Sequence, residues 1–220
     1  LHEDITAGTP VIGLEPSCVA VFRDELPNLF PHDEAAKRLA GQTMTLSEFL
    51  RRRRPDWRPG RIDRKAIVHG HCHHKAVMGF TAEGEVLKDA AREVDILDSG
   101  CCGMAGSFGF KREHYDVSQQ IGELSVLPAV RQASVDDLIV ADGFSCREQI
   151  AQSTTRRAFH TAELLQLALQ DGKRSSIPVG RHEPDYFARH HQLGEPRRML
   201  PWVAAAMAVG VVAWLAWVRK

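Results

Sequence analysis

The sequence predicts an α/β fold built around a small parallel sheet, followed by a C-terminal transmembrane helix. Short apolar runs that read as strands alternate with segments of helical periodicity, a pattern typical of parallel sheets. The cysteines all follow strand-like runs, and in such sheets the functional loops gather at the carboxyl ends of the strands. The end of the chain is a long apolar run without charge.

The expected elements can be placed from the spacing of the apolar residues. The strand-like runs are Pro10–Leu14, Ala66–His69, Val94–Leu97 and Leu138–Ala141. The segments with helical spacing are Ser17–Leu26, Leu46–Arg53, Thr81–Arg92, Glu113–Leu127, Gln149–Ala151 and His160–Gln170.

The bulk composition excludes some classes of protein. The chain has 220 residues with 28 basic and 28 acidic side chains, so it lacks the basic excess of a nucleic-acid-binding protein. Five cysteines, an odd number at wide spacing, indicate thiols in a reducing compartment rather than a disulfide scaffold. The chain begins at Leu1 and reaches a strand-like run early. We therefore expect it to be the C-terminal fragment of a longer protein.

The C-terminal run Pro201–Val218 has no charged residue and would span about 27 Å as a helix, close to the thickness of a bilayer core. Basic residues and tryptophans lie at its ends: Arg197, Arg198, Arg219, Lys220, Trp202, Trp214 and Trp217. A buried core helix is the alternative, but the run is terminal and apolar all round. We expect a single-pass anchor in the inner (cytoplasmic) membrane with the domain in the cytoplasm, although the basic residues on both flanks leave the orientation open.

The most specific motif is the run Asp98–Gly106, in which Cys101 and Cys102 are adjacent and stand between glycines. A disulfide between adjacent cysteines strains the backbone, so two neighbouring thiolates suit a metal cluster better. Cys18, Cys72 and Cys146 also follow strand-like runs. Cysteines delivered by several strand ends can converge on one site.

This pattern resembles the cysteine-rich CCG domain of iron–sulfur oxidoreductases, a family that includes parts of glycolate, D-lactate and anaerobic glycerol-3-phosphate dehydrogenases and a heterodisulfide reductase subunit. The details look closest to the C-terminal part of FAD-linked oxidase/iron–sulfur proteins of the glycolate, D-lactate and D-2-hydroxyglutarate dehydrogenase type. Cys72, Cys101, Cys102 and Cys146 match the second copy of the motif, and Glu15–Cys18 resembles the end of a first copy.

The resemblance and the composition together imply five parts. Residues 1–54 are the closing part of a first CCG-type repeat, and 55–64 are a linker rich in Pro, Gly and charge. Residues 65–170 form the second CCG-type domain, 171–198 a polar linker and 199–220 the transmembrane helix.

One position departs from the family. Its last cysteine falls at Gln149 in this sequence. The four remaining cysteines suffice for a [4Fe–4S] cubane, whereas a non-cubane cluster that needs five thiolates is in doubt.

The resemblance implies an iron–sulfur electron-transfer portion of a flavin-linked 2-hydroxy-acid dehydrogenase that passes electrons toward a membrane quinone. Cys72, Cys101, Cys102 and Cys146 would hold the cluster, and Cys18 would belong to a first-repeat site. FAD would be held by another domain or subunit. The catalytic residues cannot be identified from this sequence. The expected partners are that flavin-containing dehydrogenase, the quinone and the lipid bilayer, with no nucleic acid.

Other interpretations remain open at this point. The cysteines could be buried small hydrophobes, or they could hold zinc with four thiolates or with three and His71 or His73, as in a zinc-stabilised, membrane-tethered interaction domain. They could also act as a heterodisulfide-reductase-like thiol redox module. His69 and His74 complete a dense group of histidines that we expect to orient the cysteine loop or to lie near a quinone or flavin.

Overall fold

The computed structural model describes residues 2–171, 183–184 and 186–188. Contacts divide the chain into two units, Leu1–Glu183 and Pro184–Lys220. The predicted transmembrane helix at 199–220 lies outside the described residues, and so does most of the linker predicted at 171–198. Among the helices that are described, none combines the length and the apolar character needed to cross a membrane.

The main sheet confirms the predicted small parallel α/β arrangement. Its strands are β3 (Ile62–Val68), β4 (Ala91–Ile96) and β5 (Leu138–Val140), paired in parallel in the order β4-β3-β5. Strand β3 begins at Ile62, inside the stretch that composition indicated as a linker. The polar residues after Ile62 hide this start in the sequence, although Ile62 is buried and pairs with Ala91.

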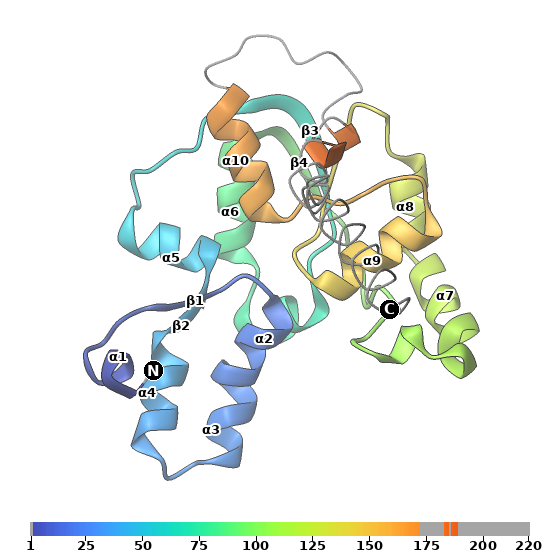
Figure 1. Cartoon of the computed structure of the whole chain (residues 1–220). Helices are drawn as coiled ribbons and strands as arrows, with labels where there is room; N and C mark the ends of the chain where they lie inside the picture. The colour runs from blue at the N-terminus through green and yellow to red at the C-terminus, as the bar shows by residue number, and fades with distance from the viewer. Residues whose placement is uncertain (1, 172–182, 185, 189–220) are drawn as a thin grey trace, which may run out of the picture. The chain divides into compact units, whose positions relative to one another are not determined.

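Helices cover both faces of this sheet, with α6 (Thr81–Ala90) and α10 (Thr161–Asp171) on one and α8 (Val126–Gln132) and α9 (Phe144–Ser153) on the other (Figure 1). Ile67 and Ile139 belong to the hydrophobic cluster formed with α8 and α9. Because strand side chains alternate between faces, Ala66 and Val68 point to the α6 and α10 side. Both faces of β5 and of the second half of β3 are therefore buried, as in parallel sheets generally, whereas the edge strand β4 is mostly exposed.

Between β4 and β5 the chain forms two short 3-10 turns, Phe108–Phe110 and Arg112–His114, and then α7 (Tyr115–Glu123). The sequence predicted one continuous helix over Glu113–Leu127. The structure instead has a break before α8, where Ser125 takes a non-helical conformation with φ −153°.

The first part of the chain forms a separate parallel pair, β1 (Val11–Gly13) with β2 (Thr43–Thr45). The predicted helix after β1 is a continuous helical stretch of α2 (Pro16–Ala20), the π-helical turn η1 (Val21–Glu25) and α3 (Leu26–Leu29). The predicted helix Leu46–Arg53 is confirmed as α5. Three further elements were not predicted: α1 (His2–Thr6), α4 (Glu34–Gln42) and β2.

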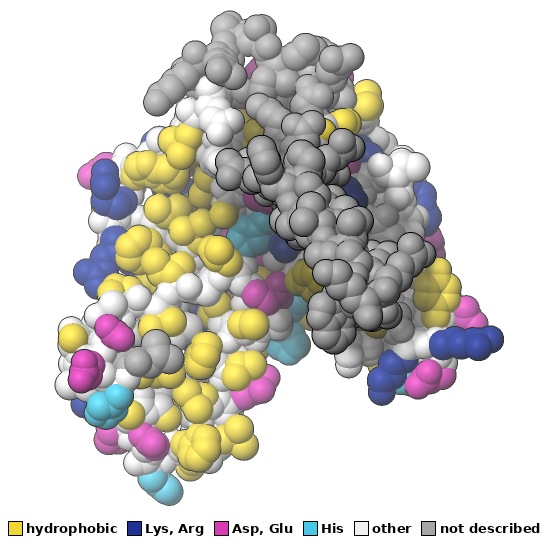
Figure 2. Space-filling view, in the orientation of Figure 1, with side chains coloured by type: hydrophobic (Ala, Val, Ile, Leu, Met, Phe, Trp, Pro, Cys, Tyr) yellow, Lys and Arg dark blue, Asp and Glu magenta, His cyan; other side chains and the backbone are white. Residues whose placement is uncertain are grey.

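Hydrogen bonds tie the two sheets together near the carboxyl ends of their strands. His160 Nε2 lies 2.7 Å from the carbonyl oxygen of Leu14, and the Phe144 amide donates to Glu15 Oε2 at 2.7 Å. Figure 2 shows hydrophobic side chains gathered over the part of this face that carries the first sheet with its helices and α10. The exposed large hydrophobic residues of the first part are Ile12, Leu14, Val21, Leu29 and Phe30.

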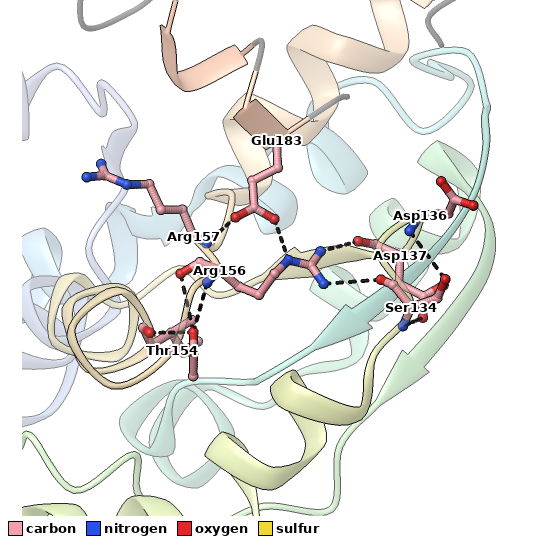
Figure 3. Close-up of polar contacts among 8 residues, drawn as sticks. Ser134, Asp136, Asp137, Thr154, Arg156, Arg157 and Glu183 are labelled. Carbon is pink, nitrogen blue, oxygen red and sulfur yellow. Dashed lines mark hydrogen bonds and ion pairs between the residues drawn. The ribbon is translucent and has the colours of Figure 1, made fainter. Parts of the chain in front are cut away.

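The partly buried Arg156 forms hydrogen bonds at the end of the main sheet where β5 begins (Figure 3). Arg156 donates from Nη2 to the carbonyl of Asp137 at 2.6 Å and from Nη1 to that of Ser134 at 3.1 Å. Its Nε pairs with Glu183 Oε2 at 2.8 Å, and the Arg157 amide also donates to Glu183. The turn before β5, the segment after α9 and Glu183 are thus fixed to one another.

Candidate metal centre

Three loops that carry cysteines leave the same edge of the main sheet. The His69–His74 segment follows β3, the Cys101–Cys102 pair follows β4, and Cys146 follows β5 near the start of α9. Parallel strands place their carboxyl ends at one edge, so these loops meet there. Lys75 donates to the carbonyl of Ser99 and thereby links the first two loops.

The structure brings the four predicted ligands together. Side-chain contacts join Cys72 to Cys101, Cys101 to Cys102, and Cys102 to Cys146. All of these thiols are free. Cys102 and Cys146 are buried, whereas Cys72 and Cys101 are partly exposed. The site therefore has a buried side and a side that solvent reaches.

The contacts among the thiols shift their pKa values in opposite directions. Contact with Cys102 and then with Cys72 lowers the pKa of Cys101 to about 2, and contact with Cys102 lowers the pKa of Cys146 to about 5. Contact with Cys101 raises the pKa of Cys72 and of Cys102. Thiolates are thus favoured at two positions, and thiolate is the form that binds soft metals.

Histidines border this group of thiols. One ring nitrogen of His69 lies within 4.8 Å of the sulfur atoms of Cys102 and Cys146, and His71 and His73 stand in the same relation to Cys72. His69 Nδ1 is 2.8 Å from Ser99 Oγ, while its Nε2 is buried without a hydrogen-bond partner, as is Nδ1 of His71. Buried polar atoms normally have partners, so these nitrogens are available to a bound group.

The loop after β4 depends on glycine. Gly103 has φ +96°, and a Cβ at this position would lie 2.1 Å from the carbonyl oxygen of Ser118 in α7. The Gly103 amide donates to Cys101 Sγ at 3.3 Å. Ala105 has a positive φ of 44°, which is unusual for a residue with a side chain. This conformation turns the chain tightly enough to present both adjacent thiols at the sheet edge.

Two other residues of interest lie apart from the four thiols. Cys18 is exposed, and among the described residues no group of three or more close metal-ligating side chains includes it. Gln149, at the position of the family's last cysteine, is fully buried in α9, and its Nε2 donates to the carbonyl of Ser118 at 3.2 Å. Its amide thus joins α9 to α7.

Fold and site together define a class: a parallel α/β domain with a group of four free thiols, a candidate metal centre, at the carboxyl edge of its sheet. Known proteins narrow this class. The chain is 36% identical over 169 residues to one of the subunits of the anaerobic glycerol-3-phosphate dehydrogenase of Escherichia coli, with 74% of this chain and 41% of the relative aligned. The chain thus spans less than half the length of this relative.

Two further relatives are more distant. D-2-hydroxyglutarate dehydrogenase of Pseudomonas putida is 28% identical over 72% of this chain and 15% of its own length. Lactate utilization protein A 1 of Bacillus mycoides is 25% identical over 76% of this chain and 71% of its own length. No family model and no solved structure matches the chain. The similarity to these relatives shows that the chain is a homologue of dehydrogenase proteins. This agrees with the class of oxidoreductases that the cysteine motif indicated.

Proposed function

We propose that this chain contributes an iron–sulfur electron-transfer module to a flavin-linked dehydrogenase, with Cys72, Cys101, Cys102 and Cys146 as the cluster ligands. The observation that carries this proposal is the convergence of four free thiols from three loops at one sheet edge. Four thiolates are the ligand set of a [4Fe–4S] cubane, and Gln149 leaves no fifth thiol in α9.

The residues present fit such a group. The thiols are close together, two of them favour the thiolate form, and unpartnered histidine nitrogens border them. When bound, a cluster accepts and releases single electrons. The chain itself holds the ligands in place, excludes water on the side of Cys102 and Cys146, and sets the potential through hydrogen bonds such as that from the Gly103 amide to Cys101 Sγ.

The electron donor in this proposal is a flavin-containing dehydrogenase domain or subunit that oxidises a 2-hydroxy acid, and the acceptor is a membrane quinone. The names of the relatives support a dehydrogenase context. The uncharged run Pro201–Val218 supports an anchor that holds the module at the cytoplasmic membrane, where a quinone is located.

The proposal is tested by purifying the full chain without oxygen and measuring iron, acid-labile sulfide and zinc. We expect iron and sulfide in similar amounts, together with a brown colour whose visible absorbance dithionite bleaches. Zinc in place of iron, with no visible absorbance, would contradict it.

Zinc is the second candidate for the bound metal because histidine nitrogens lie close to the thiols. Cys102 and Cys146 with His69, and Cys72 with His71 and His73, are mixed sulfur and nitrogen sets that zinc binds. The site would then stabilise a membrane-tethered interaction domain. The same metal analysis decides between the two candidates.

A further inference from the structure

A second group of ligand atoms lies beside the cysteine centre and contains no cysteine. His74, Glu83 and Asp142 each place one ligand atom within 4.8 Å of the other two. They come from three elements: the π-helical turn η2 (His74–Met78), α6, and the loop between β5 and α9. The fold, rather than local sequence, brings them together.

This group is buried and holds two carboxyl groups. His74 is 1% exposed and Glu83 2%, and the side chain of Asp142 is 12% exposed. Among the described residues no lysine or arginine forms an ion pair with either carboxyl, and His160 Nε2 lies 3.7 Å from Asp142 Oδ1. Burial and then the neighbouring Asp142 raise the pKa of Glu83, because two unpaired buried carboxylates are costly.

Other contacts orient the carboxyl groups. The Thr161 hydroxyl donates to Glu83 Oε1, and the Thr161 amide donates to Asp142 Oδ1 at 2.8 Å. Both carboxyl groups are therefore held by one residue, at the start of α10. Metal sites commonly have such a surrounding layer of hydrogen bonds that fixes the ligands.

Space lies beside the two carboxyl groups, and the histidine has an unpartnered nitrogen. A small cavity of about 10 Å³ is lined by Glu83, Asp142, His160 and Thr161 together with residues of the first sheet and its loops, while His74 lies outside its lining. This volume is roughly that of one atom-sized occupant. Nδ1 of His74 is buried without a hydrogen-bond partner.

We propose that His74, Glu83 and Asp142 bind a divalent first-row transition metal ion, separate from the cysteine centre. One imidazole and two carboxylates suit Zn²⁺, Mn²⁺ or Fe²⁺. The three ligand atoms lie within 4.8 Å of one another, which is close enough for one ion with ligand distances of roughly 2.0–2.2 Å after side-chain adjustment. The ion supplies the positive charge that two buried carboxylates without a lysine or arginine partner need, and it lies where the two sheets meet.

This site goes beyond the proposed function and does not depend on it, because no thiol takes part. The test titrates Co²⁺ into the full chain and follows its absorbance. Cobalt bound by thiolates shows intense sulfur-to-metal charge transfer, whereas cobalt bound by imidazole and carboxylates shows only weak d–d bands. We expect one class of bound Co²⁺ without charge transfer.

Glu83→Gln removes one of the three ligands. It should lower the affinity of the site for Co²⁺ by at least roughly 10- to 100-fold, which is the cost of losing only an outer-shell partner. The variant should fold, since glutamine has nearly the same shape as glutamate and its side-chain oxygen can still accept the hydrogen bond from the Thr161 hydroxyl. Asp142→Asn is a second variant with the same expected loss. Glu85→Gln, on the same helix with a side chain that is 57% exposed, is the matched control and should bind Co²⁺ as before.

The proposal is overturned if both Glu83→Gln and Asp142→Asn retain the class without charge transfer, or if all bound cobalt shows thiolate charge transfer. Iron bound at the cysteines should be unchanged in the two variants. Absence of iron from the wild-type chain would therefore count against the proposed function alone, and absence from the wild-type chain of the cobalt class without charge transfer would count against this site alone.

Discussion

Cys101 and Cys102 are neighbours in the sequence with different surroundings. Cys101 is partly exposed and contacts Cys72, whereas Cys102 is buried and contacts Cys146. The adjacent pair is therefore the link between the two single cysteines. The sequence motif predicted that these four positions would meet, because all of them follow parallel strands.

Replacing the central pair should remove the centre. We expect the Cys101→Ser, Cys102→Ser protein to lose most of its bound iron and its visible absorbance, since two soft ligands become hard ones. Iron analysis of the anaerobically purified protein measures this. Cys18→Ser is the control and should retain its iron, because Cys18 lies apart from the group. Full iron content in the double variant would disprove the cluster assignment.

Gln149 gives a contrasting expectation. Its amide donates to the Ser118 carbonyl rather than to a thiol, so Gln149→Ala should leave the iron content nearly unchanged. Stability should fall by about 1–3 kcal/mol because a buried side chain and a hydrogen bond are lost. Iron analysis and chemical denaturation measure the two effects. Spectroscopic identification of a non-cubane cluster, or a large loss of iron in this variant, would refute the four-thiolate assignment.

The histidines show what residue patterns cannot predict. Their density in the sequence indicated a role near the cysteines, and His69, His71 and His73 do lie beside thiols. His74 joins Glu83 and Asp142 instead, because the π-helical turn that begins there points it to another set of neighbours. The sequence around Glu83 and around Asp142 contains no motif that indicates a metal site, because Asp142 lies far from the other two residues of this group in the sequence.

At the scale of elements, Arg156 joins three segments through its guanidinium group (Figure 3). Arg156→Ala should lower the free energy of unfolding by about 2 kcal/mol, because two carbonyl groups and Glu183 lose a mostly buried partner. Denaturant titration measures this. Arg92→Ala serves as control, since the pair of Arg92 with Asp63 is largely exposed and should contribute less than about 1 kcal/mol. Equal effects of both changes would contradict the prediction.

Apolar runs predicted the main strands and several helices, and the signal is clearest at β5 and the end of β3, where both faces are buried. The elements that were missed have weaker patterns. Strand β2 has only three residues, and helix α4 has few large apolar residues, since Glu34 and two alanines follow its cap, Asp33. Asp33 accepts hydrogen bonds from the first turn of α4, which is a cap signal that the sequence did contain. The tertiary pairing of β1 with β2 is not readable from either segment alone.

At the scale of the whole molecule, the transmembrane anchor at 199–220 is predicted from the sequence alone. Deleting Arg197–Lys220 should move the protein from the membrane fraction to the soluble fraction, because an uncharged helix of this length favours lipid over water. Bound metal should be unchanged, since the deleted segment has no cysteine. Fractionation with a carbonate wash and metal analysis measure both results.

Two outcomes would contradict this prediction. A truncated protein that still sediments with washed membranes would show that the anchor lies elsewhere. A truncated protein that becomes soluble and loses its metal would show that the segment supports the domain directly.

The order of the strands also has a consequence for biosynthesis. The ribosome delivers β3 and β4 before β5, although β5 pairs with β3. Cys72, Cys101 and Cys102 are therefore translated first, and Cys146 arrives with α9, just after the strand that completes the sheet. A nascent chain that ends at Val140 has the whole sheet and lacks the last thiol. Loading of the four-thiol centre thus awaits the translation of Cys146 in the first turn of α9, and a loaded centre reports that synthesis has passed this residue.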